Sequence, residues 1–78
     1  MTETSKPNLK SMAEKWPSSF VAREQIPTFT GGAISTRRIA NLDSLKEGPS
    51  GRFRLGRKVC YPVSNLIEWL ESRATRLN

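Results

Sequence analysis

The sequence contains no histidine and only one cysteine, Cys60, among its 78 residues. A single cysteine cannot close a disulfide within the chain, and without histidine we expect no zinc site. This composition fits a reducing, intracellular compartment. Because Cys60 is flanked by Val59 and Tyr61 in a strand-like segment, we expect an inert small side chain there rather than a nucleophile.

Without histidine, acid–base or nucleophilic catalysis would depend on carboxylates, lysines, Tyr61 or Cys60. The seven carboxylates show no paired arrangement, and the five glycines form no phosphate-binding loop motif. We therefore expect that the protein is not an enzyme and has no catalytic residue, metal, cofactor or small-molecule substrate.

Long apolar runs are also missing from the sequence. No stretch approaches the roughly 18–20 apolar residues that cross a bilayer. Residues 1–19 lack the continuous apolar segment of a secretory signal. The sequence thus predicts a soluble, cytoplasmic protein with no membrane partner.

What the sequence does contain is positive charge. The formal net charge is +6 and the pI is near 10.3, and residues 34–58 alone carry +5. Charge concentrated in this way suits an acidic partner such as nucleic acid. The length allows one small domain, and a hydrophobic fraction of 36% suggests that part of the chain is unstructured.

We divide the chain into a flexible N-terminal arm (1–19), a folded domain (20–74) and a frayed C-terminus (75–78). The arm is rich in Thr, Ser, Lys, Pro and Asn and shows no sustained hydrophobic period. Trp16 is its exception, because Met12, Ala13 and Trp16 have helical spacing. We favour docking of Trp16 on the domain over the alternative that the arm contacts another protein or DNA.

Two helices joined by a glycine turn are predicted next. Ile26 and Phe29 support a first helix over about Arg23–Thr30, which Gly31–Gly32 would end. Pro27 either lies in the first turn of a helix that starts late or distorts the helix. The pair is typical of a helix-turn-helix, in which the second helix enters a groove of DNA.

The second helix is predicted over Ile34–Leu45, with Ser35 as its N-cap. Its packing face would carry Ile39, Leu42 and Leu45. The other face carries polar side chains, namely Arg37, Arg38, Asn41 and Ser44. Since arginine pairs with guanine and asparagine with adenine in the major groove, this face is either a DNA-reading surface or simply a solvated one.

A hairpin is predicted over Arg52–Tyr61, after a turn at Lys46–Gly51 that contains glycine and proline. A two-residue loop at Gly56–Arg57 would pair Leu55 with Lys58 and Phe53 with Cys60. A three-residue loop at Gly56–Lys58 would pair Leu55 with Val59 and Phe53 with Tyr61. We choose this second register, because it places all four large apolar side chains on one buried face.

In that register Arg52 and Arg54 project from the opposite face of the hairpin, and Arg57 and Lys58 lie at its tip. A basic hairpin beside a basic helix is a wing, whose simplest targets are phosphates or the minor groove. The alternative is an exposed hairpin that is kept soluble by its charge.

A last helix is predicted from Pro62 to about Arg73. It begins at Pro62 or is capped by Ser64, and its apolar stripe is Val63, Leu66, Ile67 and Leu70. The predicted fold class is α+β, a small winged helix-turn-helix with three short helices and a two-stranded antiparallel wing.

Several short motifs follow one another along this order of elements between Phe20 and Arg73. They are Thr30-Gly31, Ser35, Gly48, Leu55-Gly56-Arg57-Lys58 and Leu66-Ile67-Glu68-Trp69-Leu70. In order and spacing the chain resembles the small excisionases, or recombination directionality factors, of temperate phages and integrated elements. It also resembles the related AlpA-like regulators, which are winged-helix relatives of the MerR-type DNA-binding domain.

The resemblance implies binding of double-stranded DNA, with the second helix in the major groove and the wing at the minor groove or backbone. Carried onto this sequence, it implies base or phosphate contacts by Thr36, Arg37, Arg38 and Asn41, and backbone contacts by Arg54, Arg57 and Lys58. It further implies that several copies associate cooperatively on attachment-site DNA, bend it and direct a tyrosine recombinase toward excision.

Three other functions stay open at this point. The nearest is an AlpA-like transcriptional regulator, which the sequence does not separate from an excisionase. An RNA-binding module is less favoured, because Phe53 and Tyr61 are expected in the core rather than exposed for stacking on bases. The last is a protein-interaction domain that acts through Trp16 or the last helix.

Overall fold

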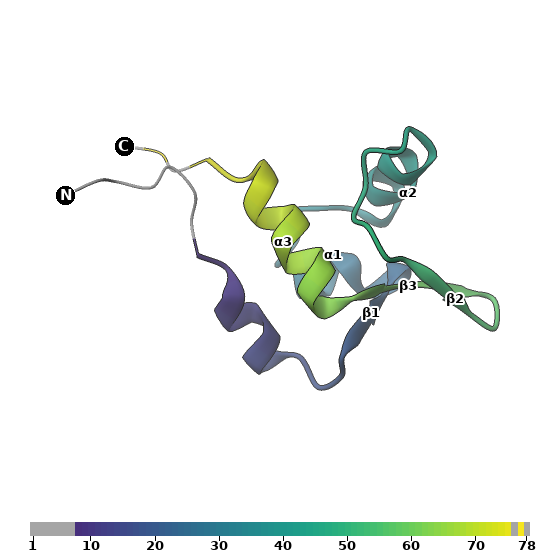
Figure 1. Ribbon diagram of the computed structural model, residues 1–78, viewed down its shortest axis with the longest axis horizontal. Coiled ribbons are helices and arrows are strands. Elements are labelled where there is room, and N and C mark those ends of the chain that lie inside the picture. Colours follow the sequence, from purple (N-terminus) through teal and green to yellow (C-terminus); the bar gives the residue numbers. More distant parts are fainter. Residues whose placement is uncertain (1–7, 76, 78) are drawn as a thin grey trace.

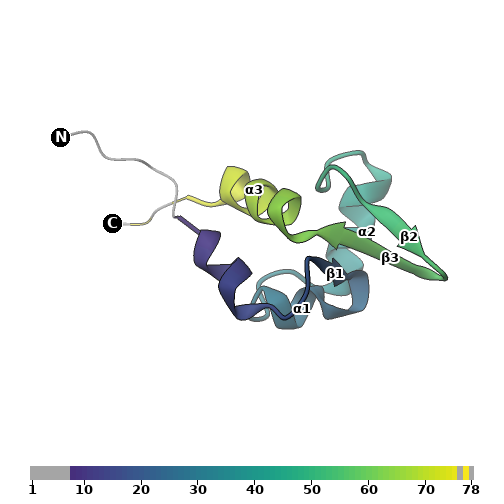
Figure 2. The same cartoon turned by 60° about the horizontal axis from the view of Figure 1, so that its bottom comes forward.

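The computed structural model describes residues 8–75 and residue 77. Its elements follow in this order: η1 (Lys10–Lys15), β1 (Phe20–Ala22), η2 (Arg23–Gln25), α1 (Ile26–Phe29), α2 (Thr36–Ser44), β2 (Phe53–Leu55), β3 (Lys58–Pro62) and α3 (Val63–Arg73). The elements η1 and η2 are 3-10 helices. The predicted α+β class is confirmed. Figures 1 and 2 show α2 and the β2–β3 hairpin at one end of the molecule, away from the end of α3.

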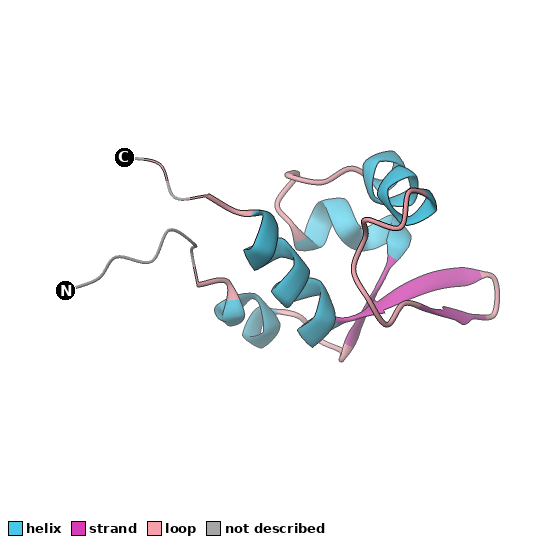
Figure 3. Ribbon diagram, turned by 45° about the horizontal axis from the view of Figure 1, so that its top comes forward, coloured by secondary structure: helices cyan, strands magenta, loops and turns pink. Residues whose placement is uncertain are grey.

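The sheet has three antiparallel strands in the order β1-β3-β2, rather than the two strands predicted. β1 pairs with the part of β3 that leads into α3 (Figure 3). Val21 of β1 lies opposite Tyr61 of β3, and both side chains are fully buried. Three residues are too few to give an alternating pattern, so pairing with β3 rather than local sequence defines β1.

The hairpin register that we chose from the sequence was wrong. In the structure Leu55 lies opposite Lys58 and Phe53 opposite Cys60, so a two-residue turn joins β2 to β3. Gly56 opens this turn with a φ of 63°, as glycine does in type II′ hairpins. Burial did not decide the register. The hairpin tip extends past β1, and among the described residues no element covers its outer face.

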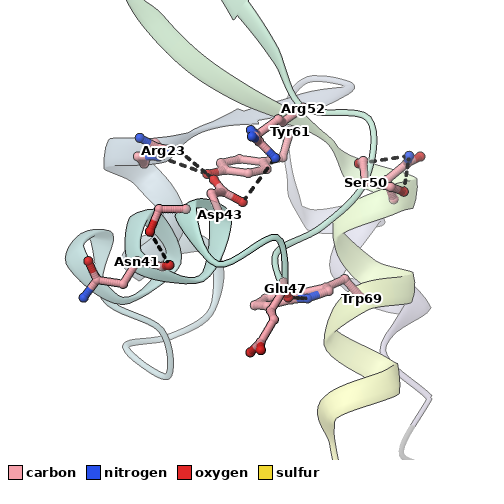
Figure 4. A network of polar contacts seen from close by, with 10 residues as sticks. Arg23, Asn41, Asp43, Glu47, Ser50, Arg52, Tyr61 and Trp69 are labelled. Atoms are coloured by element: carbon pink, nitrogen blue, oxygen red, sulfur yellow. Dashed lines mark hydrogen bonds and ion pairs between the residues drawn. The ribbon is translucent and has the colours of Figure 1, made fainter.

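The corrected register gives the sheet two different faces. Arg54, Val59 and Tyr61 share the inner face, from which Tyr61 points toward α2 (Figure 4). Phe53 and Leu55 lie on the opposite, outer face and are 39% and 56% exposed. The predicted burial of Tyr61 is confirmed. The predicted burial of Phe53 and Leu55 was wrong, as was the separation of Arg54 from Val59 and Tyr61.

The core lies between the inner face of the sheet and the helices. Its main cluster of buried side chains is Val21, Ile26, Phe29, Ile39, Tyr61, Val63, Leu66 and Ile67. The apolar stripe of α3 and the positions of Ile39 and Leu42 are thus confirmed as packing faces. Leu45 is 64% exposed, contrary to prediction, because α2 ends at Ser44 and Leu45 is already the C-cap residue.

The helix α1 is a single turn that begins at Ile26 with Pro27 in its first turn, the late start that the sequence allowed. Gly31 and Gly32 follow with φ values of 66° and 90°. Their N–H groups donate to the carbonyls of Thr28 and Pro27. The predicted glycine stop is therefore confirmed, and it turns the chain from α1 toward α2.

Residues 8–19, which the sequence assigns to the flexible arm, lie against the domain. The N–H of Leu9 donates to Glu71 Oε2 at 2.8 Å, and Lys10 Nζ lies 3.3 Å from Glu71 Oε1. The Trp16 indole N–H donates to the Phe20 carbonyl at 2.9 Å, and its ring meets Phe29 edge-on with 5.2 Å between centroids. Trp16 thus docks, as we favoured.

Parts of two predicted segments, 1–7 of the arm and 76 and 78 of the C-terminus, lie outside the described residues. At 11 residues, α3 is the longest helix in the described part of the chain. Neither α3 nor any other helix there could span the apolar layer of a membrane.

The end of α2 forms a Schellman motif. The N–H of Glu47 donates to the Leu42 carbonyl at 2.8 Å, and the N–H of Lys46 donates to the Asp43 carbonyl at 3.0 Å. Lys46 takes a left-handed φ of 63° to make these bonds. This conformation costs a residue with a Cβ atom roughly 1–2 kcal/mol.

Replacing Lys46 with glycine should therefore stabilise the fold. Relief of the left-handed strain outweighs the extra backbone entropy that glycine loses, so we expect the free energy of unfolding to rise by about 0.5–1 kcal/mol. Urea denaturation measures the change. Lys46→Ala removes the same charge but keeps a Cβ atom, and it should give no gain; equal stability of the two variants would contradict the strain argument.

Candidate nucleic-acid interface

The polar face of α2 lies opposite its buried face. The Ser35 hydroxyl accepts a hydrogen bond from the Arg38 N–H at 3.0 Å, so the predicted N-cap is confirmed. Ile39 and Leu42 then face the core, while Arg37 and Asn41 are exposed on the other side of the helix. The cap and the apolar contacts together hold the polar face outward.

Three of the four predicted contact residues on α2 are exposed. The side chains of Arg37, Arg38 and Asn41 are exposed and make no hydrogen bond or ion pair among the described residues, and Asn41 extends away from the core in Figure 4. Thr36 is partly buried at the start of the helix. Two guanidinium groups and an amide are thus available to a ligand at this surface.

The predicted contact residues on the hairpin differ from one another. Arg54 on the inner face and Arg57 at the tip are exposed, and no partner binds either side chain among the described residues. Lys58 Nζ instead lies 2.6 Å from Glu24 Oε2, between two exposed side chains. The hydrogen bond from Lys58 lowers the pKa of Glu24. Lys58 is therefore already engaged, whereas Arg54 and Arg57 are not.

A buried carboxylate connects α2 to the sheet. Asp43 is only 4% exposed, and its Oδ2 accepts hydrogen bonds from the Tyr61 hydroxyl at 2.5 Å and from Arg23 Nη2 at 2.7 Å (Figure 4). Arg23 Nε also donates to the Tyr61 hydroxyl oxygen at 3.0 Å. This network, which we call the Asp43 network, joins α2, η2 and β3.

The second carboxylate oxygen of Asp43 faces the turn that leads to β2. Oδ1 is buried and has no hydrogen-bond partner among the described residues, and Arg52 Nη1 lies 3.8 Å away. A Cβ atom on Gly48 would overlap Oδ1, so a larger residue at position 48 would displace the Asp43 carboxylate. Arg52 compensates part of the charge from a distance, and in doing so it ties the base of the hairpin to α2.

The turn between α2 and β2 is also fixed to α3. The Trp69 indole N–H donates to the Glu47 carbonyl at 2.8 Å, and Asn65 Nδ2 donates to the Ser50 carbonyl at 3.1 Å (Figure 4). Because α3 is held by its own apolar stripe, these bonds limit how far the turn can move. The turn that joins α2 to the hairpin is thus held in place by α3.

Sequence reasoning missed the roles of Asp43 and Arg23, and it placed Arg52 on the hairpin without its contact with Asp43. It counted Asp43 only as a negative charge, although Asp43 follows Ile39 by four residues and so lies on the buried side of the helix. An acidic residue in an apolar stripe is a signal that a buried cation or hydroxyl must meet it. The identities of those partners could not be read from the sequence, because they come from η2, β3 and the turn.

No three cysteine or acidic side chains in residues 8–75 and 77 lie close enough to bind a metal ion together. The sequence matches no model of a known protein family, and no curated protein sequence resembles it significantly.

Tyr61 should titrate unusually late. Burial, and then the hydrogen bond that its hydroxyl donates to Asp43, raise the pKa of Tyr61 to about 12, against the opposing effect of Arg23. Tyr61 is the sole tyrosine, so phenolate absorbance reports on it alone. We expect a midpoint near 12 in the folded protein and near 10 in urea. A folded midpoint near 10 would contradict the buried network.

The same shift predicts how stability depends on pH. Because the folded state holds the phenol proton more tightly than the unfolded state, this contribution to stability is present below pH 10 and is lost as the pH rises toward 12. Tyr61→Phe has no proton to lose at this position. Its free energy of unfolding, measured by urea denaturation between pH 10 and pH 12, should fall less steeply than that of the wild type.

Proposed function

We propose that the protein is a winged-helix protein that binds double-stranded DNA through α2 and the β2–β3 hairpin. One observation carries the proposal: Arg37, Arg38, Arg54 and Arg57 are exposed at one end of the molecule and have no partner among the described residues. Unpaired guanidinium groups on adjoining elements suit a polyanion, and their fork geometry suits phosphates and guanine edges. The Asp43 network favours a fixed spacing between the two elements.

The corrected hairpin register supports the same proposal. Arg54 shares the inner face with Tyr61, whose hydroxyl reaches α2, so Arg54 projects from the side of the hairpin that α2 occupies. In this arrangement α2 would lie in the major groove, with Arg37, Arg38 and Asn41 at base edges or phosphates. Arg54 and Arg57 would follow the backbone toward the neighbouring minor groove.

Within this class we propose an architectural protein of the excisionase type. Several copies would bind attachment-site DNA cooperatively, bend it and direct a tyrosine recombinase toward excision. An AlpA-like transcriptional regulator is the second candidate, since the same surface would serve a promoter. Bending of attachment-site DNA together with an excision assay separates the two, because a regulator would act on transcription without stimulating excision.

The first test is the salt dependence of binding to a duplex, measured by fluorescence anisotropy. Each neutralised phosphate contributes about −0.9 to the slope of log K against log salt, so Arg37→Ala/Arg38→Ala should make the slope shallower by about 1.8. Lys10→Ala/Lys15→Ala removes the same charge from η1, away from α2, and is the matched control. We expect this control to bind with nearly the wild-type slope.

Other outcomes of this experiment point to other functions. Phe53 is exposed rather than buried, so RNA must be included as a competitor. Stronger binding of single-stranded RNA would replace the duplex proposal with an RNA-binding module. A shallow slope for the wild type, with both double variants equal to it, would leave a protein-interaction domain as the better interpretation.

A further inference from the structure

The outer face of the hairpin exposes apolar side chains where the chain is otherwise basic. Leu55 is 56% exposed and directly precedes the Gly56–Arg57 tip, and Phe53 is 39% exposed two residues earlier. Both side chains lie opposite the face that meets α2. No described element covers Leu55, because β1 pairs only with Cys60–Pro62 and the hairpin projects past it (Figure 2).

We propose that Leu55 is a minor-groove wedge that bends the bound DNA. This inference rests on the proposed binding of duplex DNA. When the inner face of the hairpin follows the backbone next to α2, the outer face meets the far wall and floor of the minor groove. That wall is built from the apolar faces of deoxyribose, and leucine is among the side chains that minor-groove proteins insert to unstack and kink the duplex.

The charge around Leu55 favours DNA over a protein as the occupant of this face. Arg54 and Arg57 flank Leu55 in the chain, and neither has an internal counter-ion among the described residues. Arg54 projects from the inner face, so Arg57 at the tip is the arginine that borders the exposed side of Leu55. A protein docked on Leu55 would have to supply an acidic group to Arg57, or bury it unpaired at a cost. DNA supplies a row of phosphates on either side of an apolar-walled groove, so it suits an apolar side chain next to a cation.

The hairpin is supported at its root, as a wedge requires. The Phe53 ring meets the Phe20 ring edge-on, with 5.6 Å between centroids, and the Phe20 carbonyl accepts the Trp16 indole hydrogen bond. On the same outer face Lys58, which lies opposite Leu55 beside the tip, is held by Glu24 of η2. The ring contact holds the base of the hairpin, and the ion pair holds the strand next to the tip, against bending back when the tip is pressed into a groove.

The experiment measures bending and affinity together. Wild type and Leu55→Ala are bound to an end-labelled duplex of about 30 base pairs that contains flexible pyrimidine–purine steps. The end-to-end distance is read by energy transfer, and affinity is read at several salt concentrations. Leu45→Ala is the matched control, because Leu45 is also exposed, at 64%, but lies at the C-cap of α2 rather than on the hairpin.

We expect Leu55→Ala to weaken binding by about five- to tenfold at every salt concentration, with an unchanged slope, since an apolar contact releases no counter-ions. The bend should decrease in the same variant and stay at the wild-type value in Leu45→Ala. Arg57→Ala gives the opposite signature, a slope shallower by about 0.9. Leu55 is exposed, so its truncation leaves the core intact.

Four results would overturn the wedge. If Leu55→Ala bends and binds DNA as the wild type does, Leu55 is not the wedge, while the proposed DNA binding stands. If the wild type binds with a steep salt slope but does not bend the duplex, the same conclusion follows. If Leu55→Ala changes only self-association in sedimentation, the outer face is a protein contact. A wild type that does not bind duplex DNA overturns both proposals.

Discussion

The carboxylate of Asp43 cannot be left without partners, and this requirement sets the arrangement of α2 and the hairpin. An uncompensated buried charge costs several kcal/mol, so α2 must lie where Asp43 reaches both Arg23 and Tyr61. Apolar packing of Ile39 and Leu42 alone would tolerate some rotation of α2 about its axis. The hydrogen bonds to Asp43 do not, because their geometry is directional. The direction in which Arg37 and Asn41 point is therefore fixed from inside the domain.

Positive charge is divided between two roles in this chain. Arg23 supports the interior, and Lys10 and Lys58 form ion pairs with Glu71 and Glu24. Arg37, Arg38, Arg54 and Arg57 have no partner among the described residues, and they lie on α2 and the hairpin. The net charge of +6 thus does not show how unevenly the unpaired positive charge is distributed over the surface. What distinguishes the candidate interface is that these four arginines form no ion pair with any described residue, rather than the number of cations in the sequence.

The sequence predicted those parts of the fold that depend on local rules. The N-cap at Ser35, the stop at Gly31–Gly32 and the apolar stripe of α3 each follow from a few neighbouring residues. The failures concern β1, the hairpin register and the surroundings of Asp43, which are all decided by contacts between distant segments. In the hairpin, burial of four apolar side chains was the wrong criterion. One face of this part of the sheet is exposed, so the two-residue turn that begins with Gly56 sets the pairing of the strands. All seven predicted contact residues lie on α2 or the hairpin, but the sequence did not show that Lys58 would be engaged by Glu24.

The hydrogen bond between Leu9 and Glu71 has a consequence for the order of folding. It joins residues 62 positions apart, so it closes a far longer loop than the packing of α1 on α2 or the pairing of β2 with β3. The entropy lost in closing a loop grows with its length. Docking of η1 on α3 is therefore expected to follow formation of the domain, and η1 should detach first when the native state opens locally. The segment that contains η1 would then dock last, on a core that has already folded.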